Sequence, residues 1–152
     1  GVESASWPGR NELLHRNGQE LTLLDAAHNP DGAVSLSHVL DPSVLGEIES
    51  RRDVALVFGT LPTKNWKSML QRLEHVAYHK VFVAPPVRQP ADPERMARTF
   101  GGEVAPSVVD ALTRARALVG QRGVVVVTGS IYLVGAARAA LLGLQPDPVL
   151  EG

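Results

Sequence analysis

The sequence has no cysteine in a chain of 152 residues. Disulfides and thiolate metal sites are therefore excluded, and the absence suits a cytoplasmic protein, because reducing compartments disfavour disulfides. Long hydrophobic runs are missing as well: the stretch Gly-Val-Val-Val-Val at 123–127 falls far short of the roughly 20 apolar residues that cross a bilayer. Residues 1–10 lack the charged-then-apolar pattern of a signal peptide. These absences argue against a membrane protein.

A strong charge of either sign is also missing. The formal net charge is −1 at pH 7, so electrostatics gives no reason to expect a nucleic acid or a membrane surface as a partner. Hydrophobic residues make up 44% of the chain, which indicates a globular protein. The length fits a single domain over residues 1–152. Because natural chains begin with Met, Gly1 indicates a fragment of a longer protein.

Several sequence motifs of catalytic sites are absent. No lysine follows a glycine, so there is no phosphate-binding loop of the Walker A type. The Gly-x-Gly-x-x-Gly pattern of dinucleotide sites, the Gly-x-Ser-x-Gly nucleophile turn and the His-Glu-x-x-His zinc motif are missing too. His75 and His79 stand four residues apart, but we interpret them as a solvated pair and expect no metal site. The chain by itself looks like an incomplete catalyst.

Short apolar runs alternate with helical patterns along the chain. The runs alternate little between apolar and polar residues, which indicates strands buried on both faces of a parallel sheet. A hairpin with an Asn17-Gly18 turn is expected before the first of them. The predicted strands cover 21–25, 53–59, 80–85 and 123–129, and the predicted helices cover 30–40, 44–50, 66–75, 93–100, 110–118 and 131–142. The fold class is therefore α/β, a Rossmann-like, mostly parallel sheet with helices on both faces.

Polar residues gather where the predicted strands end, which is where α/β sheets bind ligands. In Leu-Asp-Ala-Ala-His-Asn-Pro, Asp25 ends a strand, Asn29 can cap a helix and Pro30 suits its first turn. Alternatively, the Asp25 carboxylate accepts hydrogen bonds from a ligand, and His28 donates beside the start of the helix, where anions are favoured. Spacing alone does not choose between the two interpretations.

Three further clusters also allow a structural or a functional role. Arg10 follows a Pro-Gly turn, and its guanidinium is either solvated or bound to phosphate. Lys64 precedes a predicted helix, and it is either a loop residue or a charge for a carboxylate. Ser130 follows Gly129 at a strand exit, where it either caps the next helix or helps to hold a carboxylate.

Taken in order, these clusters resemble the C-terminal domain of folylpolyglutamate synthase and dihydrofolate synthase, folate relatives of the Mur ligases of cell-wall synthesis. The matching stretches are WPGR, LLDAAHNPDGA, LVFGTLPTKNWKSML and VVVVTGSIYLVGAAR, which together span Trp7 to about Leu142. There are departures from the family pattern. Ala26 occupies a variable place, and a loop that often reads Asp-Lys-Asp is here 63–65, Thr-Lys-Asn, which keeps the lysine and loses two carboxylates.

The resemblance implies a reaction, and it implies which residues each of two domains contributes to it. It implies ATP-dependent addition of glutamate to folate or dihydropteroate through an acyl phosphate, with this chain as the smaller lobe. The ATP-binding loop and the Mg²⁺ ligands are then expected in a preceding N-terminal domain that this chain does not contain. By resemblance, Arg10 and Asp25 contact ATP, and His28 lies at the same site with a catalytic role. Ser130 and Lys64 are expected to hold the carboxylates of glutamate, and Lys64 is also a catalytic candidate.

Two other functions remain open from the sequence. One is a lobe of a cell-wall Mur-type ligase that adds a different amino acid. The other is a stand-alone α/β module that binds a small anion or a protein and performs no catalysis. Under the folate interpretation, the partners are L-glutamate, folate or dihydropteroate, and the preceding domain of the same enzyme.

Overall fold

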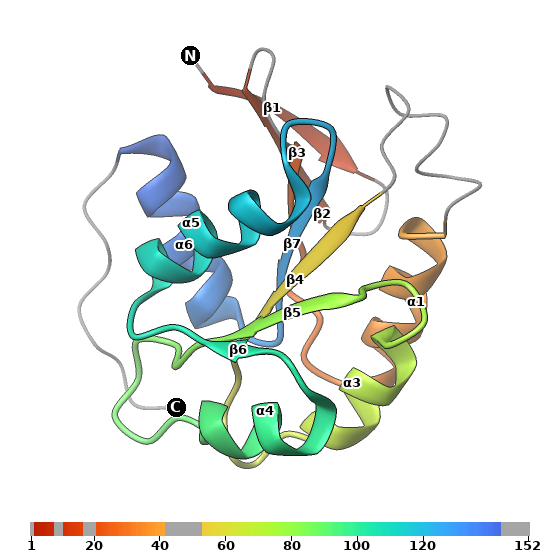
Figure 1. The fold of residues 1–152 in the computed structure, drawn as a ribbon, viewed down its shortest axis with the longest axis vertical. Coiled ribbons are helices and arrows are strands. Elements are labelled where there is room, and N and C mark those ends of the chain that lie inside the picture. The colour runs from red at the N-terminus through yellow and green to blue at the C-terminus, as the bar shows by residue number, and fades with distance from the viewer. Residues whose placement is uncertain (1, 8–10, 17–20, 42–52, 144–152) are drawn as a thin grey trace.

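The computed structural model describes residues 2–7, 11–16, 21–41 and 53–143, which Figure 1 draws as a ribbon. Two predicted features lie outside these residues. They are the helix at 44–50 and the Asn17-Gly18 turn of the hairpin.

Seven strands in the described residues form one sheet: β1 (Val2–Trp7), β2 (Asn11–Arg16), β3 (Leu21–Leu24), β4 (Val54–Phe58), β5 (His79–Phe82), β6 (Glu103–Val104) and β7 (Val124–Thr128). Their order in the sheet is β1-β2-β3-β7-β4-β5-β6. From β3 to β6 the neighbours are parallel, whereas β1, β2 and β3 are joined antiparallel. Strand β7, the last strand among the described residues, therefore lies in the middle of the sheet, between β3 and β4.

Five helices in the same part of the chain flank the sheet: α1 (Pro30–Val39), α3 (Trp66–Leu73), α4 (Pro93–Phe100), α5 (Val108–Val119) and α6 (Ile131–Leu142). In Figure 1, α5 and α6 lie on one side of the sheet, and α1 and α3 lie on the other. None of these described helices is long and apolar enough to cross a membrane. The α/β fold with a mostly parallel sheet and helices on both faces is confirmed.

The central strand β7 shows why the predicted strands carry unbroken apolar runs. Val124 and Val126 belong to the core beneath α1 and α3, whereas Val125 and Val127 belong to the core beneath α5 and α6. Successive side chains of a strand point to opposite faces, and both faces of this sheet are covered by helices. Every residue of β7 is consequently buried.

The structure differs from the sequence prediction at the sheet edges. β1 and β6 were not predicted, because one is a terminal edge strand and the other is a two-residue pairing with β5.

Helix α5 begins at Val108 rather than at residue 110, because Ser107 is its N-cap. The Ser107 hydroxyl accepts a hydrogen bond from the Asp110 amide (3.1 Å) and donates one to the Asp110 carboxylate (2.9 Å). The bounds of α4 and α6 are as predicted, and the remaining boundaries differ by at most three residues, as is usual for strand and helix ends.

Candidate functional site

Three loops leave the carboxyl ends of neighbouring strands, and backbone hydrogen bonds connect them. The Gly129 amide donates to the Ala27 carbonyl (3.2 Å), which joins the loop after β7 to the loop after β3. The Gly59 amide donates to the Thr128 carbonyl (3.4 Å), which joins the exits of β4 and β7. The three exits are therefore held together at one edge of the sheet, the place where α/β proteins bind ligands.

Asp25 is the first residue after β3, and it is buried. The residue is 8% exposed, and its Oδ1 accepts a hydrogen bond from the Ala27 amide at 2.7 Å. Burial raises the pKa of the Asp25 carboxyl above its ordinary value, and the bond from Ala27 offsets part of that effect. The side chain thus shapes the loop that leads to His28, as an aspartate does in a turn of this type.

We expect Asp25 to make folding stability depend on pH. Because its folded-state pKa is raised, the folded protein binds the proton more tightly than the unfolded chain does. The carboxyl favours folding most below its ordinary pKa of 3.8, and that contribution is lost as the pH rises through the folded-state pKa. Asp25→Asn keeps an oxygen that can accept from the Ala27 amide and removes the charge. Urea unfolding of both proteins should show the variant gaining stability over the wild type between about pH 3 and about pH 7. A difference that does not change with pH would contradict this.

His28 lies on the exposed side of the same loop, two residues before α1. Its Nδ1 is 3.2 Å from the Ala26 carbonyl oxygen. Because a carbonyl only accepts, a hydrogen bond here requires a proton on Nδ1, and it leaves Nε2 for another partner. Asn29 then caps α1, with its Oδ1 accepting from the Gly32 amide at 2.8 Å.

Lys64 lies in the turn between β4 and α3, and it is half-buried. Its amide donates to the Leu61 carbonyl (3.1 Å), and the next residue, Asn65, caps α3 by accepting from the Ser68 amide (3.3 Å). Within the described ranges, the Lys64 ammonium forms no ion pair. The turn therefore presents a cation whose charge is not neutralised there by a carboxylate.

Ser130 is the N-cap of α6 and is 4% exposed. Its hydroxyl oxygen accepts from the Tyr132 amide at 3.1 Å, so its hydroxyl hydrogen is left to donate elsewhere. The chain reaches this position through Gly129, whose φ of 112° lies in a region that favours glycine. The two roles expected for Ser130 are thus compatible. The cap uses the hydroxyl oxygen as an acceptor, and binding of a carboxylate would use the hydroxyl hydrogen as a donor.

His28, Lys64 and Ser130 line one pocket, although they come from three separate loops. Its volume is about 240 Å³, and its other lining residues are Thr60, Leu61, Gly129, Ile131 and Tyr132. Among the residues that the structure describes, the lining includes a lysine and a histidine but no carboxylate, and the N-terminus of α6 adds partial positive charge. Such a pocket suits a carboxylate or phosphate group. It is smaller than the ~300–1,000 Å³ typical of whole ligand sites, so we interpret it as one wall of a larger site.

The structure brings together most of the residues that the sequence singled out, but not all. Asp25 does not line the pocket; it is buried at the start of the loop that carries His28. Arg10 lies outside the described residues. Thr60 and Tyr132 line the pocket, and sequence reasoning missed them. Each is a polar residue within the first few positions after a buried strand, and this pattern could have identified both in the sequence.

The described residues do not fit a resident metal ion. No group of three or more His, Asp or Glu side chains is arranged there to hold one. The expectation that Mg²⁺ ligands belong to a preceding domain stays a prediction.

Comparisons with known proteins give the chain a family. Residues 9–131 match the family model described as Mur ligase, glutamate ligase domain. The chain is 34% identical to a probable bifunctional folylpolyglutamate synthase/dihydropteroate synthase of Haloferax volcanii, over 91% of this chain and 16% of that protein. It is 31% identical to the folylpolyglutamate synthase of Lacticaseibacillus casei, over 94% of this chain and 32% of that protein. The chain thus spans about a third or less of these curated relatives.

A solved structure has the same fold. The bifunctional folylpolyglutamate synthase/dihydrofolate synthase of Yersinia pestis, complexed with AMPPNP and a Mn ion, matches with a TM-score of 0.75 and 27% identity. The match covers 92% of this chain and 32% of that one.

Proposed function

Because the chain belongs to the Mur ligase family, as a glutamate ligase domain, we propose that it is the smaller lobe of an ATP-dependent amide-forming ligase. The ligase adds L-glutamate to folate or dihydropteroate. The observation that carries the proposal is the pocket in which His28, Lys64 and Ser130 meet, with no carboxylate among its described lining residues. The names of the relatives favour a folate substrate over a cell-wall precursor.

In this proposal the residues of the pocket bind and orient an anionic substrate. The Lys64 ammonium and the N-terminus of α6 attract the carboxylates of glutamate, and the Ser130 hydroxyl donates a hydrogen bond to one of them. His28 lines the same pocket with Nε2 left for a ligand, and we expect the amine and the second substrate to meet beside it. ATP supplies the phosphoryl group that turns an unreactive carboxylate into an electrophile. Arg10 and Asp25 remain candidates for contacts to ATP.

The proposal includes a preceding domain with the phosphate-binding loop. A pocket of this size and charge holds only part of such a reaction, and water must be kept from the activated carboxylate by closure of two lobes. A cytoplasmic location belongs to the proposal as well and rests on the lack of cysteine. We expect residues 1–152 alone to bind ATP weakly or not at all in calorimetry, since most phosphate contacts would come from the other lobe.

An activity assay on the natural chain that carries this domain tests the proposal. We expect ADP release to require both L-glutamate and a folate or dihydropteroate, and the product to gain one glutamyl residue in mass spectrometry. Glutarate is the matched control, because it keeps both carboxylates but lacks the amine, so no amide can form. Turnover with a cell-wall precursor instead, or no glutamate-dependent product, would contradict the folate assignment.

A further inference from the structure

Thr60 is a lining residue of the pocket and carries a buried hydroxyl. The residue is 0% exposed and lines the pocket with Lys64 and Ser130. Its Oγ1 has no hydrogen-bond partner among the residues that the structure describes. Nearly all buried polar groups in proteins have a partner, and one without is destabilising. The position of this hydroxyl therefore needs an explanation other than the stability of the free domain.

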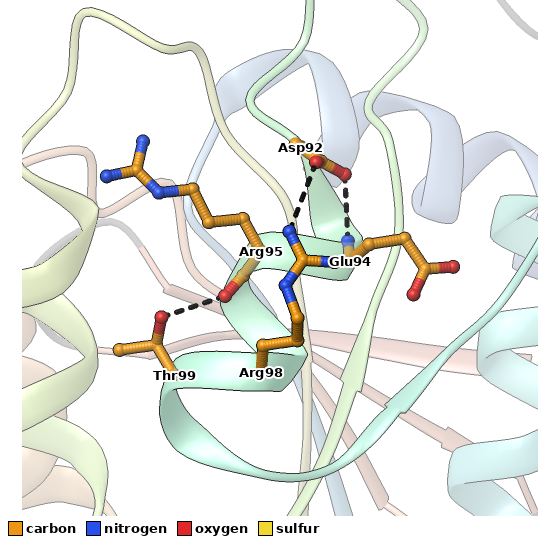
Figure 2. Close-up of polar contacts among 5 residues, drawn as sticks. All are labelled: Asp92, Glu94, Arg95, Arg98 and Thr99. Atoms are coloured by element: carbon orange, nitrogen blue, oxygen red, sulfur yellow. Dashed lines mark hydrogen bonds and ion pairs between the residues drawn. The ribbon is translucent and has the colours of Figure 1, made fainter.

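The backbone of Thr60 is held from two sides. It follows β4 by two residues, and its carbonyl accepts a hydrogen bond from the Ala91 amide at 2.9 Å. Asp92 follows Ala91 and is the N-cap of α4. Its Oδ1 accepts a hydrogen bond from the Glu94 amide (2.9 Å), and its Oδ2 lies 4.0 Å from Arg98 Nη2 (Figure 2). The remaining freedom of Thr60 is rotation about χ1, which exchanges its hydroxyl and methyl positions. Because Thr60 is 0% exposed, a ligand meets its hydroxyl only once the surrounding pocket side chains move aside.

The surroundings of Thr60 define the ligand group that would use this hydroxyl. Lys64 contributes a full positive charge, and Ser130 contributes a hydroxyl that is free to donate at the start of α6. A carboxylate has two oxygens and about four acceptor positions. One cation and one hydroxyl leave some of these unsatisfied, and a second hydroxyl on the pocket wall would satisfy another.

We infer that Thr60 is a substrate-contacting residue whose hydroxyl donates a hydrogen bond to a carboxylate of the amino-acid substrate. The inference rests on the proposed function, because it takes glutamate as the occupant of the pocket. It adds a specificity-determining contact: the bound carboxylate supplies the acceptor that the free protein lacks at this position.

The chain contains a matched control. Thr128 is also 0% exposed, and its Oγ1 also has no partner in the described part of the chain, but Thr128 does not line the pocket. Valine has the shape of threonine without the hydroxyl, so Thr60→Val and Thr128→Val remove the same buried group. Both variants should melt at the wild-type temperature or above, because an unsatisfied buried hydroxyl is replaced by an apolar group of the same shape.

The two variants should differ in kinetics. In the natural ligase chain, Thr60→Val should raise KM for L-glutamate about 10- to 100-fold, as expected when a hydrogen bond to a charged group is lost. Its KM for ATP should stay unchanged, and Thr60→Ser should restore most of the glutamate affinity. Thr128→Val should leave KM for glutamate at the wild-type value.

Each result bears on a separate statement. A wild-type enzyme without glutamate-dependent turnover would overturn the proposed function and this inference with it. An active wild type with an unchanged glutamate KM in Thr60→Val would overturn the inference alone. A rise in KM for ATP rather than glutamate would also overturn it, because the hydroxyl would then serve a phosphate. Equal kinetic effects in Thr60→Val and Thr128→Val, or a loss of melting temperature in Thr60→Val, would show that the role is structural.

Discussion

Replacing Gly129 with alanine is expected to destabilise the domain severely. Gly129 has a φ of 112°, which L side chains rarely adopt. A Cβ at this position would lie 2.5 Å from the Gly59 carbonyl oxygen and 3.1 Å from the Phe58 ring. Backbone strain of roughly 1–3 kcal/mol and steric overlap of similar cost add to about 2–6 kcal/mol. A whole domain is typically stable by only about 5–15 kcal/mol.

Urea denaturation measures this loss, and Gly135→Ala is the control. Gly135 lies within α6, and beyond its chain neighbours and its own helix backbone a Cβ there would meet no atom of the described residues within 4 Å. Alanine is favoured over glycine in a helix, so this variant should gain about 0.5–1 kcal/mol. If Gly129→Ala retained wild-type stability, the close approach of the β4 and β7 exits would not be a constraint on the fold.

Replacing Lys64 with alanine should have the largest effect on activity. Lys64 is half-buried, and within the described part of the chain its pocket contains no carboxylate and its ammonium forms no ion pair. The attraction between a fixed charge and an anionic substrate is stronger in a site that partly excludes water than it is in bulk water. We therefore expect kcat/KM of the proposed ligase to fall about 10²- to 10³-fold, with little change in melting temperature.

Lys67→Ala is the matched control for this charge. Lys67 is exposed on α3, three residues further along, and its ammonium lies 5.7 Å from the centre of the Trp66 ring rather than in the pocket. Its loss should cost about 0.5–1 kcal/mol of stability and leave the kinetics unchanged. Equal losses of kcat/KM in both variants would indicate a general electrostatic effect and remove Lys64 from the site.

Much of the local structure could be predicted because its causes are local. Asn29 is the N-cap of α1 as expected, and Asn65 and Asp92 cap α3 and α4 for the same local reason, since a short polar side chain before a helix satisfies its first amides. The buried strands β4 and β7 were visible as apolar runs. Strand β6 was not, because two exposed residues become a strand only by pairing with β5.

The residues of the candidate site were predicted where local sequence identifies them and missed where distant neighbours decide. His28, Lys64 and Ser130 stand at strand exits, so their polar character was visible in the sequence. The burial of Asp25 and the unpartnered hydroxyl of Thr60 depend on neighbours distant in the sequence, such as the strand that lies alongside. No local pattern carries that information.

The sequence by itself determined the α/β class and the polar strand exits, because propensity and hydrophobic periodicity act over a few residues. The tertiary structure decided which exits share a pocket. Strand β7 comes last in the chain and pairs with both β3 and β4, so the loops that begin at residues 25, 59 and 129 become neighbours. Strand order depends on how the whole hydrophobic surface is buried, and for that reason only the folded chain brings His28, Lys64 and Ser130 together.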